Sequence, residues 1–204
     1  MLRPGKIVCV GRNYRDHAKE LGNEVPTAPL IFLKPPSAIL APGAPIVRPR
    51  VSERVDFEGE IGIVVGRTLT RATEADAATA VRGICAVNDV TARDLQKGDG
   101  QWTRAKGFDS FCPIGPEVAY AGAFDALEVV TRVNGEERQR GHTRDLVFSI
   151  PFLLSYISQV MTLEPGDLIA TGTPAGVGPL VAGDAVEIEV VGLSRVANPV
   201  IDAA

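Results

Sequence analysis

The chain has 204 residues, of which 45% are hydrophobic, and a formal net charge of -4. This length suits one domain with a sizeable buried core, and we expect a single catalytic domain over residues 1–204. Phosphate binding requires a concentrated basic face, and the basic residues here are diluted by acids, Pro and Gly. Nucleic acid is therefore not an expected partner.

Cysteine usage and the apolar runs indicate where the protein is found. Cys9, Cys85 and Cys112 lie far apart in apolar runs and form no Cys-x-x-Cys pair, which predicts buried thiols in a reducing compartment. The apolar run at residues 7–10 is too short for a signal peptide, and no later run is long enough to cross a bilayer. We expect a cytoplasmic location and no membrane partner.

Short apolar or alternating runs, separated by many glycines and prolines, predict a strand-rich chain. The expected strands cover residues 6–11, 30–34, 55–66, 84–87, 127–133, 136–140, 167–170 and 185–191. The second half of the strand at 55–66 is almost wholly apolar, which indicates burial on both faces. The Asn134-Gly135 pair predicts a hairpin turn between two of these strands.

Two short helices have expected capping residues at their starts. For the first, Asn13 is the expected cap, Asp16 lies at the third position after it, and Gly22 ends the helix. The second begins with the pair Thr91 and Asp94 and is expected to run to about residue 98.

The longest expected helix covers residues 149–161, and its Phe, Leu, Ile and Val content suggests that it packs against a sheet. Strands and helices do not alternate regularly, and no G-x-G-x-x-G follows a strand, so a doubly wound dinucleotide-binding fold is not supported. The fold class predicted is α+β, strand-rich.

Three acids alternate at the start of the strand expected at 55–66. Asp56, Glu58 and Glu60 would share one face of a strand. Neighbouring carboxylates repel unless water or a cation lies between them, and hard oxygen ligands suit Mg²⁺, Mn²⁺ or Ca²⁺ rather than Zn²⁺. The alternative is a solvated acidic edge strand, which the apolar run that follows makes less favoured.

A second group of polar residues follows the buried strand at 84–87. Asp89 lies two residues before the expected cap Thr91, so its carboxylate is free for another use. Arg93 and Gln96 are three apart and share a helix face. A turn aspartate followed by a surface helix explains the same pattern. This segment alone does not decide between that interpretation and a functional site.

His17 and Glu20 are three residues apart on the first helix, where they can hydrogen-bond. Such a contact would orient the imidazole and raise its basicity, as a general base requires. A solvated surface pair is the alternative. The other histidine, His142, lies in a polar segment.

The glycine-rich segment 171–178 follows a strand and contains two hydroxyl side chains at its start. Its backbone N–H groups can face an anion, and the absence of a Lys-Ser/Thr ending favours a carboxylate over a nucleotide. A tight connection that requires positive φ angles accounts for the same glycines. The chain has no G-x-S-x-G elbow and no His/Cys zinc cluster.

Together these segments resemble the fumarylacetoacetate hydrolase family. The resemblance is strongest to its small single-domain branch, the acylpyruvate hydrolases that also decarboxylate or tautomerise oxaloacetate. The segments that carry it are residues 10–14 with His17 and Glu20, then 32–35, 56–60, 89–94, 105–109, 149–151 and 171–174.

The resemblance implies roles for particular residues. The metal ligands for Mg²⁺ or Mn²⁺ would be Glu58, Glu60 and Asp89. The catalytic residues would be His17 and Glu20, in a lid segment over the substrate, and Lys106. The substrate-binding residues would be Arg12, Arg93, Gln96 and Thr173. The family fold, a mixed β-sandwich roll that usually forms a homodimer, is also implied.

The resemblance implies a divalent-metal-dependent hydrolase that cleaves the C3–C4 bond of acylpyruvate-type 2,4-dioxo acids and releases pyruvate. Decarboxylation or tautomerisation of oxaloacetate would pass through the same enolate. The pair His17 and Glu20 favours hydrolysis, because water attack at C4 requires a base. The alternatives are a 2-hydroxyhepta-2,4-diene-1,7-dioate isomerase or decarboxylase of aromatic catabolism, and a metal-binding family member without turnover.

Overall fold

Two stacked sheets form most of the molecule in the computed structural model, which describes residues 2–20, 22 and 24–204. The larger sheet contains, in spatial order, β10 (Val118–Ala119), β7 (Val81–Asn88), β6 (Gly59–Val65), β13 (Leu168–Ala170), β1 (Ile7–Gly11) and β2 (Leu30–Lys34). The second sheet contains β12 (Glu136–His142), β11 (Glu128–Val133), β15 (Ala185–Val190), β16 (Ser194–Asp202) and β4 (Ile46–Arg48).

Two smaller sheets and five α-helices complete the described part of the chain. The small sheets are β14 (Gly178–Pro179) with β5 (Val55–Phe57) and β8 (Thr91–Ala92), and β3 (Ile39–Leu40) with β9 (Cys112–Pro113). The α-helices are α1 (Arg15–Glu20), α2 (Glu74–Ala78), α3 (Arg93–Gly98), α4 (Thr103–Lys106) and α5 (Ile150–Val160). Short 3₁₀ turns cover Pro36–Ala38 and Thr143–Asp145.

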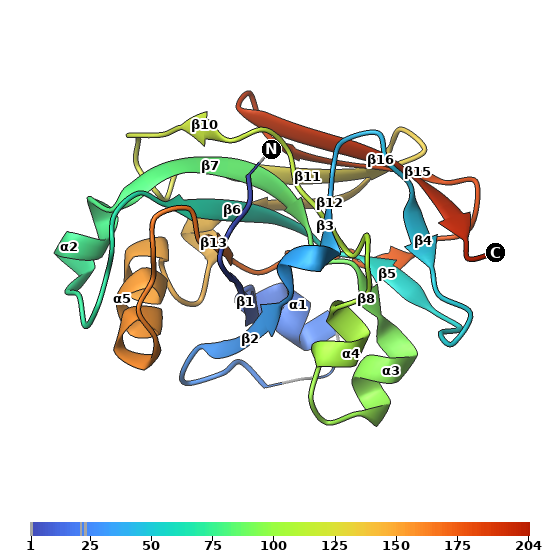
Figure 1. The fold of residues 1–204 in the computed structure, drawn as a ribbon, viewed down its shortest axis with the longest axis horizontal. Coiled ribbons are helices and arrows are strands. Elements are labelled where there is room, and N and C mark those ends of the chain that lie inside the picture. The colour runs from blue at the N-terminus through green and yellow to red at the C-terminus, as the bar shows by residue number, and fades with distance from the viewer. Residues whose placement is uncertain (1, 21, 23) are drawn as a thin grey trace.

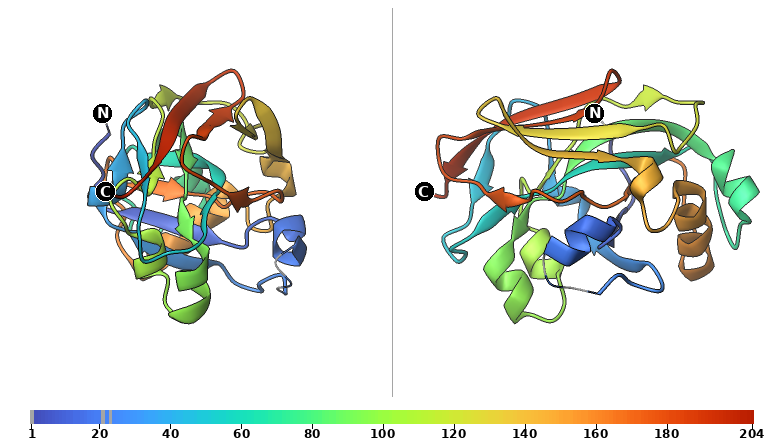
Figure 2. Two further views of the ribbon diagram at one scale, coloured as in Figure 1. Left: turned by 90° about the vertical axis from the view of Figure 1, so that its right-hand side faces the viewer. Right: turned by 180° about the vertical axis from the view of Figure 1, so that it is seen from behind.

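The five-stranded sheet lies over β6 and β7, whereas α1, α3 and α4 lie on the opposite side of these strands (Figures 1 and 2). Along β16 every second residue is buried from Ser194 to Val200, so one face of this strand packs inward and the other faces solvent. All seven residues of β6 are buried, as its apolar sequence predicts. The strand-rich α+β prediction is confirmed.

Residues 55–66 were predicted as one continuous strand, and this prediction was wrong. The structure has two strands here, β5 and β6, which are separated at Glu58. The Glu58 N–H donates to the Asn88 side-chain oxygen at 3.0 Å, and the Glu58 carbonyl accepts from the Asp89 N–H at 2.8 Å. At this break the chain passes from the three-stranded sheet to the six-stranded sheet. The hydrogen bond to the Asn88 side chain, 30 residues away in sequence, thus lies at the position where β5 ends.

The predicted cap of the first helix was also wrong. The Asn13 side-chain oxygen accepts from the Phe148 N–H at 2.9 Å, and its Nδ2 donates to the Thr171 carbonyl at 2.9 Å. Asn13 therefore ties the end of β1 to two distant segments. The turn at Gly22 is as predicted, with a φ of 70° and an N–H that donates to the Lys19 carbonyl at 2.9 Å.

The capping pair predicted for α3 is absent, because both side chains bond elsewhere. The Thr91 hydroxyl donates to the Asp89 carbonyl at 2.8 Å, and the Asp94 carboxylate accepts from the Ser52 hydroxyl at 2.5 Å. The helix itself ends at Gly98 as expected.

Other local predictions are confirmed. Asn134 and Gly135 have φ angles of 54° and 82°, as a type I′ hairpin turn requires. Ser149 caps α5 by accepting from the Phe152 N–H at 3.4 Å. The three cysteines are free and buried. Among the described residues, no helix combines the length and apolarity needed to cross a membrane.

Candidate active site

A cavity of about 510 Å³ is lined by residues from α1, α3, α4 and the ends of several strands. It contains all of the residues predicted from the sequence for a metal, a substrate or catalysis. These are Arg12, His17, Glu20, Glu58, Glu60, Asp89, Arg93, Gln96, Lys106 and Thr173. Segments separated by up to about 160 residues in sequence thus meet at one place.

Three buried carboxylates converge at the cavity. Glu58, Glu60 and Asp89 each offer one oxygen, and these oxygens all lie within 4.8 Å of one another. The pairing of β6 with β7 explains the convergence, because Gly59 lies opposite Asn88. The residues that flank each member of this pair are therefore neighbours across the two strands. Asp56, the third acid of the sequence pattern, is not part of the cluster.

Two buried lysines bind the carboxylates. The Lys106 ammonium donates to Glu58 Oε2 at 2.7 Å and to Asp89 Oδ2 at 2.6 Å. The Lys34 ammonium donates to the other Asp89 oxygen at 2.7 Å, and its side chain is 0% exposed. Burial by itself lowers the pKa of Lys106, but Asp89 and Glu58 outweigh burial and hold this pKa above its ordinary value. Lys106 is therefore charged at neutral pH.

Arg93 joins the cluster to its surroundings through three contacts. Its guanidinium donates to Glu58 Oε1 at 2.6 Å, to Asp56 Oδ2 at 2.9 Å and to the Gln96 side-chain oxygen at 2.6 Å. Asp56 thus serves as a buried counter-ion for Arg93. The guanidinium holds Glu58 in place and leaves the cavity with a fixed positive group.

Glu60 differs from the other two carboxylates of the cluster. The Gly172 N–H donates to its Oε2 at 2.8 Å, and within the described part of the chain no cationic side chain bonds to it. Burial, Asp89 and Glu58 together raise the pKa of Glu60 well above its ordinary value. Among the described residues, Glu60 is therefore the one carboxyl group of the cluster that no cationic side chain contacts.

The pKa of Glu58 is shifted in the opposite direction from that of Glu60. Burial alone would raise its pKa, but the charges of Lys106 and Arg93 outweigh burial and hold the pKa of Glu58 well below its ordinary range. Three hard oxygen donors lie in a buried cluster, and one of them has no cation in contact within the part of the chain that the structure describes. This arrangement fits a divalent metal ion such as Mg²⁺ or Mn²⁺.

His17 and Glu20 lie at the cavity as a pair, as predicted. His17 is 4% exposed, and its Nδ1 lies 3.4 Å from Glu20 Oε2. The two Glu20 oxygens accept from the Gly176 N–H at 3.1 and 3.2 Å. Helix α1 is thereby joined to the glycine-rich segment 171–178, where Gly172 and Gly176 adopt positive φ angles of 104° and 100°.

One wall of the cavity is aromatic. Trp102 and Phe32 meet edge to face with ring centroids 5.2 Å apart, and the Lys106 ammonium lies 5.0 Å from the Phe32 centroid. A Cβ at Gly11 would come within 2.8 Å of the Trp102 ring, so glycine allows this close approach. Trp102, the single tryptophan of the chain, lies immediately before α4.

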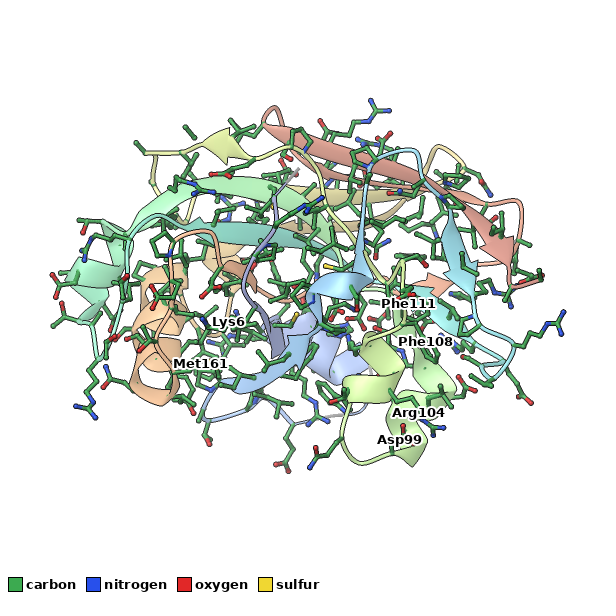
Figure 3. All side chains as sticks on the ribbon, viewed as in Figure 1. Lys6, Asp99, Arg104, Phe108, Phe111 and Met161 are labelled. Carbon is green, nitrogen blue, oxygen red and sulfur yellow. The ribbon has the colours of Figure 1, made fainter. Side chains whose placement is uncertain are left out.

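An ion pair lies in the segment that connects α3 and α4 and carries Trp102. The Arg104 guanidinium Nε donates to Asp99 Oδ2 at 2.7 Å, and Figure 3 shows these two side chains together at the tip between α3 and α4. Phe108 and Phe111 follow α4 and lie side by side, with centroids 5.1 Å apart (Figure 3). Lys97 and Trp102, which come from this part of the chain, both line the cavity.

Sequence reasoning missed two buried polar residues that support the site. Lys34 ends the apolar run of β2, and a charge in that position was the available signal. Gln139 is 2% exposed on β12, but the sequence around it is polar and gave no signal of burial.

Comparison with known proteins defines the family. Residues 6–201 match the family described as fumarylacetoacetate (FAA) hydrolase C-terminal, and the chain belongs to this family. It is 46% identical over 203 residues to oxaloacetate tautomerase FAHD1, mitochondrial, of Arabidopsis thaliana, covering 96% of this chain and 91% of the relative.

Solved structures agree with this assignment. The crystal structure of 5-carboxymethyl-2-hydroxymuconate delta-isomerase from Mycobacterium smegmatis superposes with a TM-score of 0.92 at 46% identity, covering 100% of this chain and 81% of that chain. The 2-hydroxyhepta-2,4-diene-1,7-dioate isomerase from Mycobacterium marinum gives a TM-score of 0.91 at 45% identity, covering 100% and 77%. The fold predicted from the resemblance is confirmed, and the protein is an enzyme of this family.

Proposed function

We propose that this protein is a divalent-metal-dependent enzyme that interconverts the keto and enol forms of a small 2-oxo acid of the oxaloacetate type. The observation that carries the proposal is one cavity that unites the acidic cluster, Lys106 and His17. Similarity to a relative named as an oxaloacetate tautomerase supports this reaction over the hydrolysis that the sequence favoured.

The acidic cluster would hold the cation through Glu58, Glu60 and Asp89. When bound, the cation would supply Lewis acidity to the 2-oxo acid. Arg12 and Lys97 line the same cavity, and neither forms an ion pair within the described residues, so both are free to bind substrate carboxylates.

His17 would transfer the proton. Toward the enol, its imidazole, held by Glu20, takes the proton from C3 and delivers it to the C2 oxygen. Toward the keto form it takes the proton from the C2 hydroxyl and delivers it to C3, so the imidazole is unchanged after each conversion. Lys106 remains charged and donates a hydrogen bond to the developing negative charge on the C2 oxygen. Phe32 and Trp102 limit the access of water on their side of the cavity.

Hydrolysis of acylpyruvates is the second candidate, favoured by the contact between His17 and Glu20. The same imidazole would then activate water toward C4, releasing pyruvate and an acid. Isomerisation of a 2-hydroxy-dienedioate is a further possibility, supported by the name of the Mycobacterium marinum neighbour. Product analysis by NMR separates these reactions, because only hydrolysis yields two carbon fragments.

His17→Ala should lower the rate of oxaloacetate tautomerisation by about 10²- to 10⁴-fold, the range for loss of a general base. The decay of enol absorbance in the presence of Mg²⁺ or Mn²⁺ measures this rate. His142→Ala is the matched control, because His142 lies outside the cavity near Glu128 and its loss should leave the rate unchanged. An unchanged rate in His17→Ala would refute the role of this imidazole.

The single-domain organisation, a homodimer and a cytoplasmic location remain proposals that follow from the sequence and the family resemblance. Sedimentation of the purified protein would test the homodimer. The Arabidopsis relative is named as mitochondrial, so cell fractionation is the appropriate test of location.

A further inference from the structure

Gln139 is a buried side chain whose carboxamide forms four hydrogen bonds. Its oxygen accepts from the Gly59 N–H at 3.0 Å and from the Thr131 hydroxyl at 2.8 Å. Its nitrogen donates to the Thr173 hydroxyl at 2.7 Å and to the Pro174 carbonyl at 2.8 Å. These contacts use its two N–H donors and both acceptor positions of its oxygen. They also fix the orientation of the amide, because a backbone N–H can only donate and a carbonyl can only accept.

Three of these groups form a closed ring of hydrogen bonds. The Gly59 N–H donates to Gln139, Gln139 donates to the Thr173 hydroxyl, and that hydroxyl donates to the Gly59 carbonyl at 3.0 Å. The ring therefore holds both polar groups of residue 59. A Cβ at this position would lie 2.0 Å from the Thr131 hydroxyl oxygen, so any other residue here would displace Thr131, which donates to Gln139.

Gly59 is the residue between Glu58 and Glu60. The φ and ψ angles at the Gly59 Cα lie between the two glutamates, so they set how these two carboxylates are directed relative to each other and toward Asp89. We infer that Gln139, on a strand of the other sheet, is a positioning residue that holds Glu58 and Glu60 in register for a divalent cation. This inference rests on the proposed metal site.

The ring also defines how Thr173 can act. Its hydroxyl hydrogen is donated to the Gly59 carbonyl, and one of its lone pairs accepts from Gln139. The hydroxyl is therefore left with only an acceptor position for a ligand. The substrate-binding role predicted for Thr173 would accordingly require a donor on the ligand or the Thr173 backbone.

The affinity for Mn²⁺ alone, measured on metal-stripped protein by EPR of the free ion, tests the inference. Gln139→Met removes all four hydrogen bonds at similar side-chain length and should weaken Mn²⁺ binding by about 10- to 100-fold, the range for outer-shell partners of metal ligands. Thr131→Ala is the matched control: it removes one bond to Gln139 but leaves the ring, and its Mn²⁺ affinity should stay within about twofold.

Thr173→Val provides a second variant that breaks the same ring, and it keeps the test available if Gln139→Met folds poorly. Because the two residues act through one ring, the double variant should bind Mn²⁺ no more weakly than the weaker single variant. Additive losses, or Gln139→Met binding as tightly as Thr131→Ala, would overturn the positioning role. Failure of the unaltered protein to bind Mn²⁺ would overturn the proposed metal site together with this inference.

Discussion

Glu60→Gln should abolish Mn²⁺ binding and at the same time raise the melting temperature of the metal-stripped protein. Glu60 is buried beside two other carboxylates, and among the described residues only the Gly172 N–H bonds to it. A neutral amide removes the repulsion of Glu60 by the carboxylates of Asp89 and Glu58, and it keeps an oxygen that can accept from Gly172. A gain of about 1 kcal/mol would raise the melting temperature by about 2–4 °C in a chain of this size.

Glu58→Gln is the matched control, two residues away in the same cluster. Glu58 accepts from both Arg93 and Lys106, so its neutralisation leaves two buried cations less well paired. This variant should also lose Mn²⁺ affinity, but its melting temperature should fall. Differential scanning calorimetry of both metal-stripped variants makes the comparison, and a fall in melting temperature for Glu60→Gln would contradict the charge balance described for the site.

Lys34→Met should lower the free energy of unfolding by about 3–5 kcal/mol, the range for removal of one partner of a buried ion pair. The ammonium is 0% exposed and bonds to Asp89 Oδ1 at 2.7 Å and to the Val90 carbonyl at 3.2 Å. Methionine retains the side-chain length but leaves the Asp89 oxygen buried without this donor. Urea denaturation of the metal-stripped protein measures the loss.

Lys19→Met serves as the control for Lys34→Met. Lys19 is 72% exposed and lies 3.8 Å from Asp16, so its removal should change the free energy of unfolding by less than about 1 kcal/mol. Equal effects of the two substitutions would show that Lys34 does not act as the buried counter-ion of Asp89.

Local sequence patterns predicted much of the fold because they reflect local physics. The apolar run of β6, the alternation along β15 and the Asn134-Gly135 turn each depend on neighbouring residues, and each was found as predicted. The predictions that failed depend on distant partners. Asn13 bonds to Phe148 and Thr171 instead of capping α1, and no pattern near residue 13 reveals those partners.

In the candidate site, too, residues in short local motifs were predicted and residues that depend on distant partners were not. Side chains with distinctive chemistry in short motifs, such as Glu58 and Glu60 two residues apart, were found from sequence and lie in the cavity. Lys34 and Gln139 support them from the end of an apolar strand and from a polar edge strand. Their importance arises from hydrogen bonds across 55 and 80 residues of sequence, which only the tertiary structure displays.

The most direct test of the account is the tautomerisation of oxaloacetate by metal-stripped protein as Mn²⁺ is added stepwise. The three converging carboxylates predict that the rate is near the uncatalysed value at first and rises to a plateau at about one Mn²⁺ per chain. Glu60→Gln, measured in parallel, should show no such rise. Full activity of the stripped protein, unchanged by Mn²⁺, would contradict the proposal that the acidic cluster holds a catalytic cation.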